Sequence, residues 1–185
     1  MIFTFLGWFG TISYLLNHAY ISLIQQRNDT IYYGGNLLAA SALVISSIAS
    51  NSIQAAVING FWAIISILIL IKVDLNRLPF SRRIFRLILL CFACALLYQA
   101  YTTKGLDIEL LGWSSAFVFS ASYLLFSVGK MQILNYLICN TYAAFAILPQ
   151  VWVDQNWPVF GLEICWGCIS IYGVTRKYSE IHLID

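Results

Sequence analysis

Seven long apolar stretches limit what this chain can fold into more than any other feature. They occupy residues 3–24, 31–50, 53–71, 84–101, 111–128, 131–151 and 157–174. Each is roughly 18–23 residues long, the length that a helix needs to cross a hydrocarbon layer of ~30 Å. The stretches are continuously apolar, whereas the strands of a membrane barrel alternate over ~10 residues. The sequence therefore predicts an all-α integral membrane protein with seven transmembrane helices.

The composition agrees with a lipid bilayer as the main partner. Hydrophobic residues make up 61% of the chain and charged residues only 10%, whereas soluble domains carry about 25% charged residues. A net charge of +2 is too small to indicate binding to nucleic acid. All five cysteines fall inside the predicted spans, which does not predict a disulfide framework. We found no cluster of histidine and carboxylate residues, so we expect no metal and no cofactor.

The basic residues predict how the chain lies in the membrane. If the N-terminus is outside, the connections on the inner side hold nine of the ten lysines and arginines, and the outer side holds only Lys104. The nine inner residues are Arg27, Lys72, Arg77, Arg82, Arg83, Arg86, Lys130, Arg176 and Lys177. Cytoplasmic loops carry an excess of such residues. We therefore predict a multi-pass protein of the cell inner (plasma) membrane, with its N-terminus outside and its C-terminus cytoplasmic.

A polar and aromatic stripe occurs twice in the chain at a constant offset. Asn59, Trp62 and Ser66 are spaced so that a helix places them on one face. The matching residues 104 positions later are Glu163, Trp166 and Ser170. Further matches, at offsets of 104–105, pair Tyr32 with Tyr136, Asn36 with Asn140, and Leu6-Gly7-Trp8 with Leu111-Gly112-Trp113. These matches in three successive spans predict an internal duplication.

The duplication predicts a particular order of helices. Three helices are an odd number, so a direct fusion would invert the second copy. The span at 84–101 has no counterpart and restores the orientation, which gives two parallel three-helix repeats joined by a linker helix, a 3+1+3 plan. The predicted domains are repeat 1 at 1–72, a basic loop and linker helix at 73–105, repeat 2 at 106–175 and a cytoplasmic tail at 176–185.

Side chains inside the spans form the candidate site. Glu163 costs a few kcal/mol in lipid, so it should face the bundle interior or water. It could bind a proton or a cation, or it could only fix helix packing. The two repeat-related asparagines could line a cavity, or bond across helices for ~0.6 kcal/mol each. The indoles could stack on a sugar or a base, or pack in the bundle. The candidate substrate-binding residues are Asn59, Trp62, Glu163, Trp166, Asn36 and Asn140.

Two CxxC pairs allow a third class of function. Cys91 with Cys94, and Cys165 with Cys168, each share a helix face at this spacing. A membrane thiol-redox enzyme uses such pairs, but it also needs cysteines in loops for exchange with partners. No predicted loop of this chain has a cysteine. We therefore do not expect an enzyme.

The 3+1+3 pattern resembles the SWEET and SemiSWEET transporter group and is similar to the nicotinamide riboside transporters. The first repeat, with Gly7-Trp8-Phe9-Gly10, residues 32–36 and residues 59–62, resembles small uncharacterised bacterial three-helix proteins of that group. Residues 160–173 look like the last helix of the riboside transporters. In SWEETs, asparagines and tryptophans line the sugar site, which the resemblance carries to Asn59, Trp62 and Trp166. The chain departs from the pattern at Glu163, which replaces the second asparagine, and it lacks a proline-glutamine motif in each first helix.

Together, these observations predict a transporter of a small polar solute, sugar-like or nucleoside- or vitamin-like. One three-helix bundle would rock against the other, with the candidate site near the membrane midplane. The alternative is a non-transporting accessory or scaffold subunit of a membrane complex. A homo-oligomer and a complex with another membrane protein are both compatible with the sequence.

Overall fold

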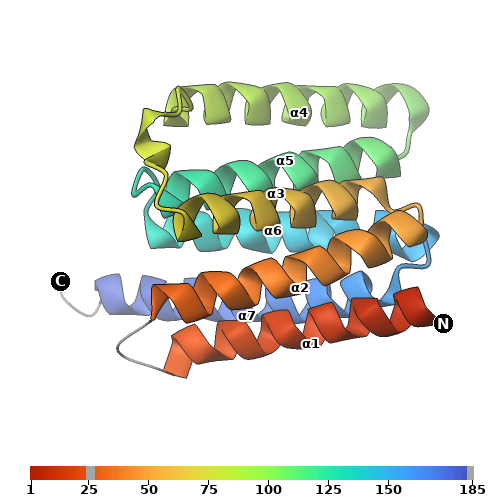
Figure 1. Cartoon of the computed structure of the whole chain (residues 1–185). Helices are drawn as coiled ribbons and strands as arrows, with labels where there is room; N and C mark the ends of the chain where they lie inside the picture. The colour runs from red at the N-terminus through yellow and green to blue at the C-terminus, as the bar shows by residue number, and fades with distance from the viewer. Residues whose placement is uncertain (24–27, 183–185) are drawn as a thin grey trace. The chain divides into compact units, whose positions relative to one another are not determined.

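The computed structural model describes residues 1–23 and 28–182, and the side chains of residues 1–17 and 28–179 among them. Within these ranges the chain has seven α-helices, one short 3-10 helix and no strand (Figure 1). The elements are α1 (Ile2–Leu23), α2 (Asp29–Ala49), α3 (Ile53–Leu70), η1 (Leu75–Arg77), α4 (Arg82–Thr103), α5 (Ile108–Ser127), α6 (Ile133–Val153) and α7 (Trp157–His182). The predicted all-α class and the seven predicted helices are confirmed.

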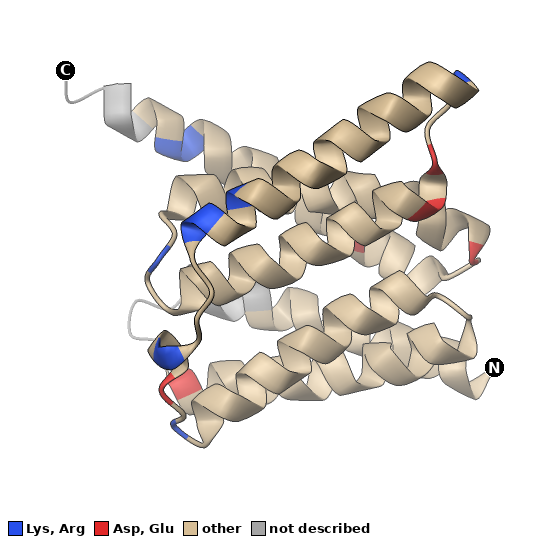
Figure 2. Ribbon diagram, turned by 90° about the horizontal axis from the view of Figure 1, so that it is seen from above, with Lys and Arg blue, Asp and Glu red and all other residues tan. Residues whose placement is uncertain are grey.

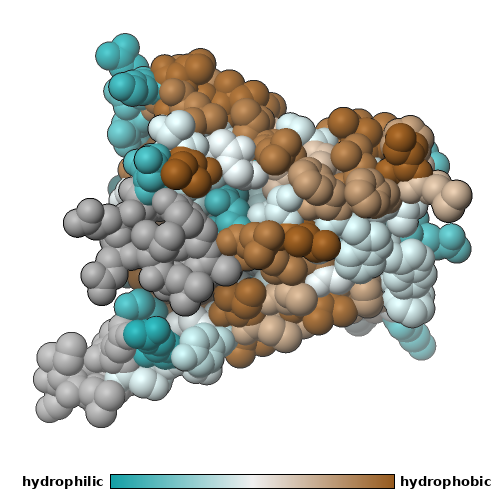
Figure 3. Space-filling model, turned by 60° about the horizontal axis from the view of Figure 1, so that its bottom comes forward, coloured by the Kyte–Doolittle hydropathy of each residue, from teal (hydrophilic) through white to brown (hydrophobic). Residues whose placement is uncertain are grey.

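Helix length and hydropathy indicate a membrane location. In the described part of the chain, six helices, α2 to α7, are long and apolar enough to cross a membrane. The described apolar stretch of α1 is shorter, Ile2–Asn17. Figure 3 shows broad hydrophobic surface on the face in view, which suits contact with lipid. The 3+1+3 plan, the inner membrane and the orientation of the termini stay predictions.

Local capping explains where several helices begin. The N-cap residues of α2, α4 and α5 are Asn28, Ser81 and Asp107, and each side-chain oxygen accepts a hydrogen bond from a backbone N–H three residues later. Such caps satisfy N–H groups that the first turn of a helix leaves unpaired. In Figure 2 the charged residues gather mainly in the connections and at the ends of helices. The apolar middles and capped ends together define the spans.

The chain divides into two compact units. Unit 1 comprises Met1–Leu78 and Val151–Leu162, and unit 2 comprises Pro79–Gln150 and Glu163–Asp185. Unit 1 therefore holds α1, α2 and α3, together with the turn between α6 and α7. Unit 2 holds α4 and α5, most of α6, and α7 from Glu163 onwards.

Small residues bring α1 and α2 close together in unit 1. A Cβ atom on Gly10 would lie 2.8 Å from Cγ of Leu43 and 2.9 Å from the backbone oxygen of Ala39, so only glycine fits there. Ala39, Ala40 and Leu43 are completely buried. Packing through small residues is a common way for membrane helices to associate. α3 packs against the α2 helix as well.

Unit 1 also includes a late segment of the chain that is bonded to its first two helices. The hydroxyl of Thr11 in α1 donates to the backbone oxygen of Pro158 at 2.8 Å. The amide of Asn156 donates to the hydroxyl of Ser47 in α2 at 3.1 Å. Thr11, Ser47 and Asn156 are all buried. These bonds fix the α6–α7 turn to α1 and α2.

In unit 2, α4 packs on α5 through its first turns. Phe85 is 5% exposed and stacks on Phe117 at 5.7 Å between ring centroids, beside Ala121 and Leu125. Most of the remaining α4 surface is exposed, including Leu97 at 71% and Tyr101 at 84%. An apolar helix with so little buried surface suits the role of a linker helix surrounded by lipid.

Apart from Lys104, the basic residues of unit 2 lie at one end of its helices (Figure 2). The guanidinium Nε of Arg82, at the start of α4, donates to the backbone oxygen of Lys130, between α5 and α6. The start of α6 also lies close to α7 near Gly173, because a Cβ atom there would be 3.0 Å from Leu137. The α4 helix ends instead near Lys104, next to the acidic start of α5. The predicted orientation of the chain in the membrane rests on this difference in basic residues between the two ends of the helices.

Candidate functional site

Two predicted site residues of unit 2 contact each other directly. The indole Nε1 of Trp166 in α7 donates to Oδ1 of Asn140 in α6 at 3.0 Å. The Nδ2 of Asn140 donates to the backbone oxygen of Tyr136, one turn earlier, at 2.7 Å. Asn140 is 1% exposed, so its whole amide group is used inside the unit. Two of the residues that the repeat singled out are thus joined by a hydrogen bond inside unit 2.

Glu163 lies one turn before Trp166 on α7. Its side chain is 5% exposed, and its Oε2 atom has no hydrogen-bond partner among the described residues. Buried carboxyl oxygens in proteins are nearly always bonded. An acid inside an apolar helix is costly and is usually kept for a role in binding or proton transfer. Glu163 is therefore the side chain of unit 2 that most needs a further partner.

In unit 1, Asn36 is bonded to a residue that the sequence did not place in the site. Nδ2 of Asn17 in α1 donates to Oδ1 of Asn36 in α2 at 2.8 Å, and to the backbone oxygen of Tyr32 at 2.9 Å. The Nδ2 atom of Asn36 has no partner among the described residues. Asn17 and Asn36 are both buried. Asn17 could have been found, because it is an amide within an apolar span.

The two remaining predicted residues lie on α3. Asn59 is 5% exposed, and its Nδ2 donates to the backbone oxygen of Ala55 one turn earlier at 2.9 Å. Trp62 is also 5% exposed and meets the ring of Tyr14 edge-on, with 5.8 Å between ring centroids. The edge-on geometry is typical of stable aromatic pairs. Ser66, the third residue of this stripe, is completely buried.

Each unit therefore holds its own set of candidate residues, all of them buried except Trp166, which is half-buried. Asn36, Asn59 and Trp62 belong to unit 1, and the set of unit 2 is Asn140, Glu163 and Trp166. The structure joins Asn140 and Trp166 by a direct bond, and it gives Asn36 a different partner, on α1. Asn36 and Asn140 are thus both buried asparagines but differ in their bonds, whereas Asn59 and Glu163 differ in residue type. Their role in binding a substrate stays a prediction.

Comparison with known protein families gives one match. A family model matches residues 3–77 and 108–180. The chain belongs to this family. The family has no known function, so membership leaves the resemblance to SWEET and riboside transporters a prediction. No curated protein matches the chain. No solved structure matches it either.

The two ranges matched by the family model correspond to two sets of helices. Residues 3–77 hold nearly all of α1 together with α2 and α3, and residues 108–180 hold α5, α6 and most of α7. The intervening part of the chain contains α4. Each range thus contains three long helices, and the two-repeat plan stays a prediction.

The cysteine pairs lie on helix surfaces. Cys91, Cys94, Cys165 and Cys168 are exposed, and all five cysteines of the chain are unbridged in the structure. The described residues contain no group of three or more histidine, cysteine or acidic side chains that could hold a metal ion. Nothing in the surroundings of the four exposed cysteines assigns them a chemical role.

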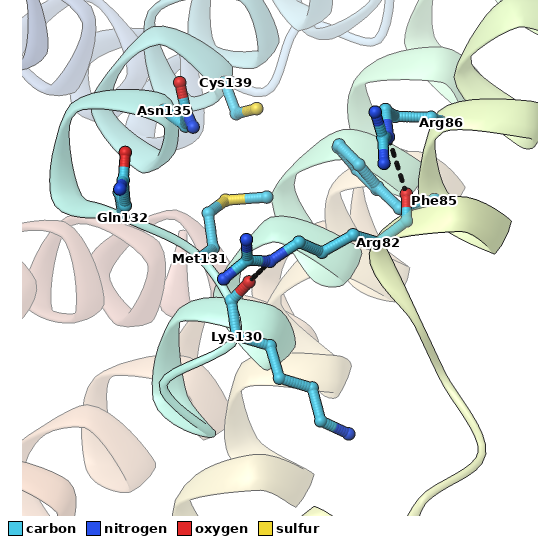
Figure 4. A pocket seen from close by; sticks show the side chains of 8 residues that line it. All are labelled: Arg82, Phe85, Arg86, Lys130, Met131, Gln132, Asn135 and Cys139. Carbon is cyan, nitrogen blue, oxygen red and sulfur yellow. Dashed lines mark hydrogen bonds between the residues drawn. The ribbon is translucent and has the colours of Figure 1, made fainter.

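Unit 2 has a pocket that the sequence did not predict. It has a volume of about 320 Å³ and lies where the start of α4 meets the α5–α6 connection and the start of α6 (Figure 4). The lining residues are Arg82, Phe85, Arg86, Lys130, Met131, Gln132, Asn135 and Cys139. The sequence indicated a basic segment around Arg82, but not that the α5–α6 connection would complete a pocket with it.

Proposed function

We propose that the protein is a membrane transporter that moves a small polar solute by alternating access. The observation that carries the proposal is Glu163, a buried acid in an apolar helix whose Oε2 atom lacks a bonding partner among the described residues. Such acids in membrane proteins are usually part of a pathway for solutes, ions or protons. A purely structural acid would be expected to have all its bonds within the bundle.

The surrounding side chains supply the chemistry that a small polar solute needs. Trp62 and Trp166 offer flat apolar faces, which suit the ring of a sugar or a nucleoside base. Asn36 has an amide nitrogen without a partner among the described residues, and an amide can donate to a solute hydroxyl or carbonyl. In this proposal Glu163 accepts a hydrogen bond from the solute or carries a coupling proton. No enzymatic step is part of the proposal.

The pattern of the family match also supports a transporter. The same family model matches two ranges with three long helices each, separated by α4. Duplicated three-helix repeats are a frequent plan of transporters, in which binding groups come from corresponding positions of the two repeats. The candidate residues occupy such positions, since Asn36 and Asn140, and Trp62 and Trp166, are each 104 residues apart.

Uptake by purified protein tests the proposal. Proteoliposomes would be incubated with a mixture of sugars, nucleosides and water-soluble vitamins, and their contents analysed by mass spectrometry. We expect at least one solute to accumulate above the level in protein-free liposomes. Replacing Glu163→Gln should lower its uptake about tenfold or more, since one bond to a charged group is worth about 1.5–3 kcal/mol. The matched control is Glu109→Gln, at an exposed acid near the start of α5. Equal uptake by both variants would remove Glu163 from the site.

A non-transporting accessory subunit is the second candidate, and the exposure of α4 favours it. This helix presents apolar side chains such as Leu87, Leu97 and Tyr98 along its length, with Phe85 its only buried residue among those described. A partner helix could pack there as readily as lipid. Purification in a mild detergent separates the two candidates. A partner retained in constant stoichiometry, together with no solute uptake, would favour the subunit.

A further inference from the structure

The pocket of unit 2 has a composition that suits one class of ligand. Arg82 and Arg86 come from the first turns of α4, and Lys130 from the α5–α6 connection. None of the lining residues is acidic. The volume of about 320 Å³ is at the lower end of the range for small-molecule sites, about 300–1,000 Å³. A basic pocket of this size suits a small anionic group.

The two arginines keep donors available for a ligand. Nε of Arg82 donates to the backbone oxygen of Lys130, and Nε of Arg86 donates to the backbone oxygen of Arg82 at 3.3 Å. Among the described residues these are the bonds of the two guanidinium groups, so their Nη atoms remain open to an acceptor. Guanidinium groups bind phosphate oxygens through two parallel bonds. The bonds through Nε fix the position of the groups without using those donors.

Neutral donors and an apolar wall complete the pocket. Gln132 and Asn135, at the start of α6, are the two uncharged amide side chains that line it (Figure 4). Phe85, Met131 and Cys139 form an apolar wall, and Phe85 is fixed there by its stacking on Phe117. The ammonium group of Lys130 points away from the arginines in Figure 4 and adds positive charge near the pocket. A polar opening beside an apolar wall suits a ligand that has a phosphate group and an apolar part.

We propose that this pocket binds a phosphate group, held by Arg82 and Arg86 with Gln132 and Asn135 as neutral donors. The phosphate is that of an anionic phospholipid headgroup or a soluble phosphate. The pocket lies at the ends of apolar helices, where the headgroups of a bilayer would lie. Basic residues near an anionic membrane surface are attracted to its headgroups. The site is independent of the proposed transport, because it uses none of the candidate solute-binding residues.

Thermal unfolding of the full-length protein in a non-ionic detergent tests the proposal. One arm adds phosphatidylglycerol, a second adds phosphatidylcholine as the neutral-headgroup control, and a third adds inorganic phosphate alone. A ligand that binds the folded protein raises its unfolding temperature. We expect phosphatidylglycerol, inorganic phosphate or both to do so, and phosphatidylcholine not to do so. Phosphatidylglycerol alone would identify a lipid headgroup, and inorganic phosphate at similar potency would identify a soluble phosphate.

Substitutions in the pocket test whether the rise in unfolding temperature comes from binding there. Arg82→Gln and Arg86→Gln should each weaken the binding of the active ligand about tenfold, as expected for the loss of a charged hydrogen bond. The matched control is Arg83→Gln, an exposed arginine in the same turn of α4 that does not line the pocket. If a glutamine variant does not fold, Arg82→Lys and Arg86→Lys keep the charge and should weaken binding less. The proposal fails if neither ligand stabilises the wild type, or if Arg83→Gln weakens binding as much as Arg82→Gln.

Discussion

The indole of Trp166 donates a hydrogen bond to the side-chain oxygen of Asn140 at 3.0 Å, which joins α7 to α6 inside unit 2. Both residues have counterparts 104 positions earlier, Trp62 and Asn36, but Asn36 is bonded to Asn17 of α1 instead. At these two pairs of positions the residue types are the same, but the hydrogen bonds differ. This difference can be measured.

Removing the indole donor should destabilise the protein. Trp166→Phe keeps an aromatic ring but leaves the Oδ1 atom of Asn140 without its bond from the indole, and we expect a loss of about 1–2 kcal/mol. Unfolding by denaturant in detergent measures the change. Trp113→Phe is the control, because Trp113 is 37% exposed. If both variants lose the same free energy of unfolding, the loss comes from the smaller ring and not from the hydrogen bond to Asn140.

A methyl group on Gly10 should force α1 away from α2. The new Cβ would come within 2.9 Å of the oxygen of Ala39, and overpacking of this kind costs about 1–3 kcal/mol. Gly34→Ala is a matched control, because a Cβ atom there has no neighbour within 4 Å and alanine favours the helix by about 0.5–1 kcal/mol. We expect Gly10→Ala to lower the unfolding temperature and Gly34→Ala to raise it. A neutral Gly10→Ala would show that α1 and α2 are less closely packed.

The bond between Asn17 and Asn36 should appear as a coupling energy. Asn17→Leu removes a donor and leaves a buried amide oxygen unpaired, which costs about 1–3 kcal/mol. Replacing both asparagines by leucine removes the polar pair, so the double variant should be less destabilised than the sum of the single variants. Equilibrium unfolding of the four proteins gives the coupling. An additive result would mean that the two amides do not interact.

Labelling tests the predicted orientation. In a chain with its five cysteines replaced by serine, single cysteines would be introduced as Lys104→Cys and Arg83→Cys, at opposite ends of α4. With the N-terminus outside, a membrane-impermeant maleimide should label position 104 in intact cells, and position 83 only after lysis. The reverse pattern would invert the orientation. Labelling of both positions in intact cells would mean that α4 does not cross the membrane.

The positions of the helices could be predicted because apolar runs mark where a chain crosses lipid. The predicted span at 53–71 corresponds to α3 at Ile53–Leu70, and that at 31–50 to α2 at Asp29–Ala49. The prediction for the last helix ended at 174, whereas α7 continues to His182. Hydropathy marks the hydrocarbon crossing, and a helix can continue as a polar segment beyond it.

The bonds of the candidate site were harder to predict. The type of residue and the repeat pointed to Asn140 and Trp166, but a helical pattern does not say which partner an amide will bond. Asn17 became part of the polar set only because α1 and α2 lie close enough for its amide to reach Asn36. The pocket around Arg82 likewise depends on residues 48 positions apart, whose approach is a matter of tertiary packing.

The bonds of Thr11 to Pro158 and of Asn156 to Ser47 can form only late in the synthesis of the chain. Asn156 follows Ser47 by 109 residues, so at about 5–20 residues per second it is made roughly 5–20 s later. During most of that interval α1 to α3 are present without the segment that completes unit 1. A chain that stops before Val151 should therefore insert its first helices and remain more sensitive to protease than the full-length protein.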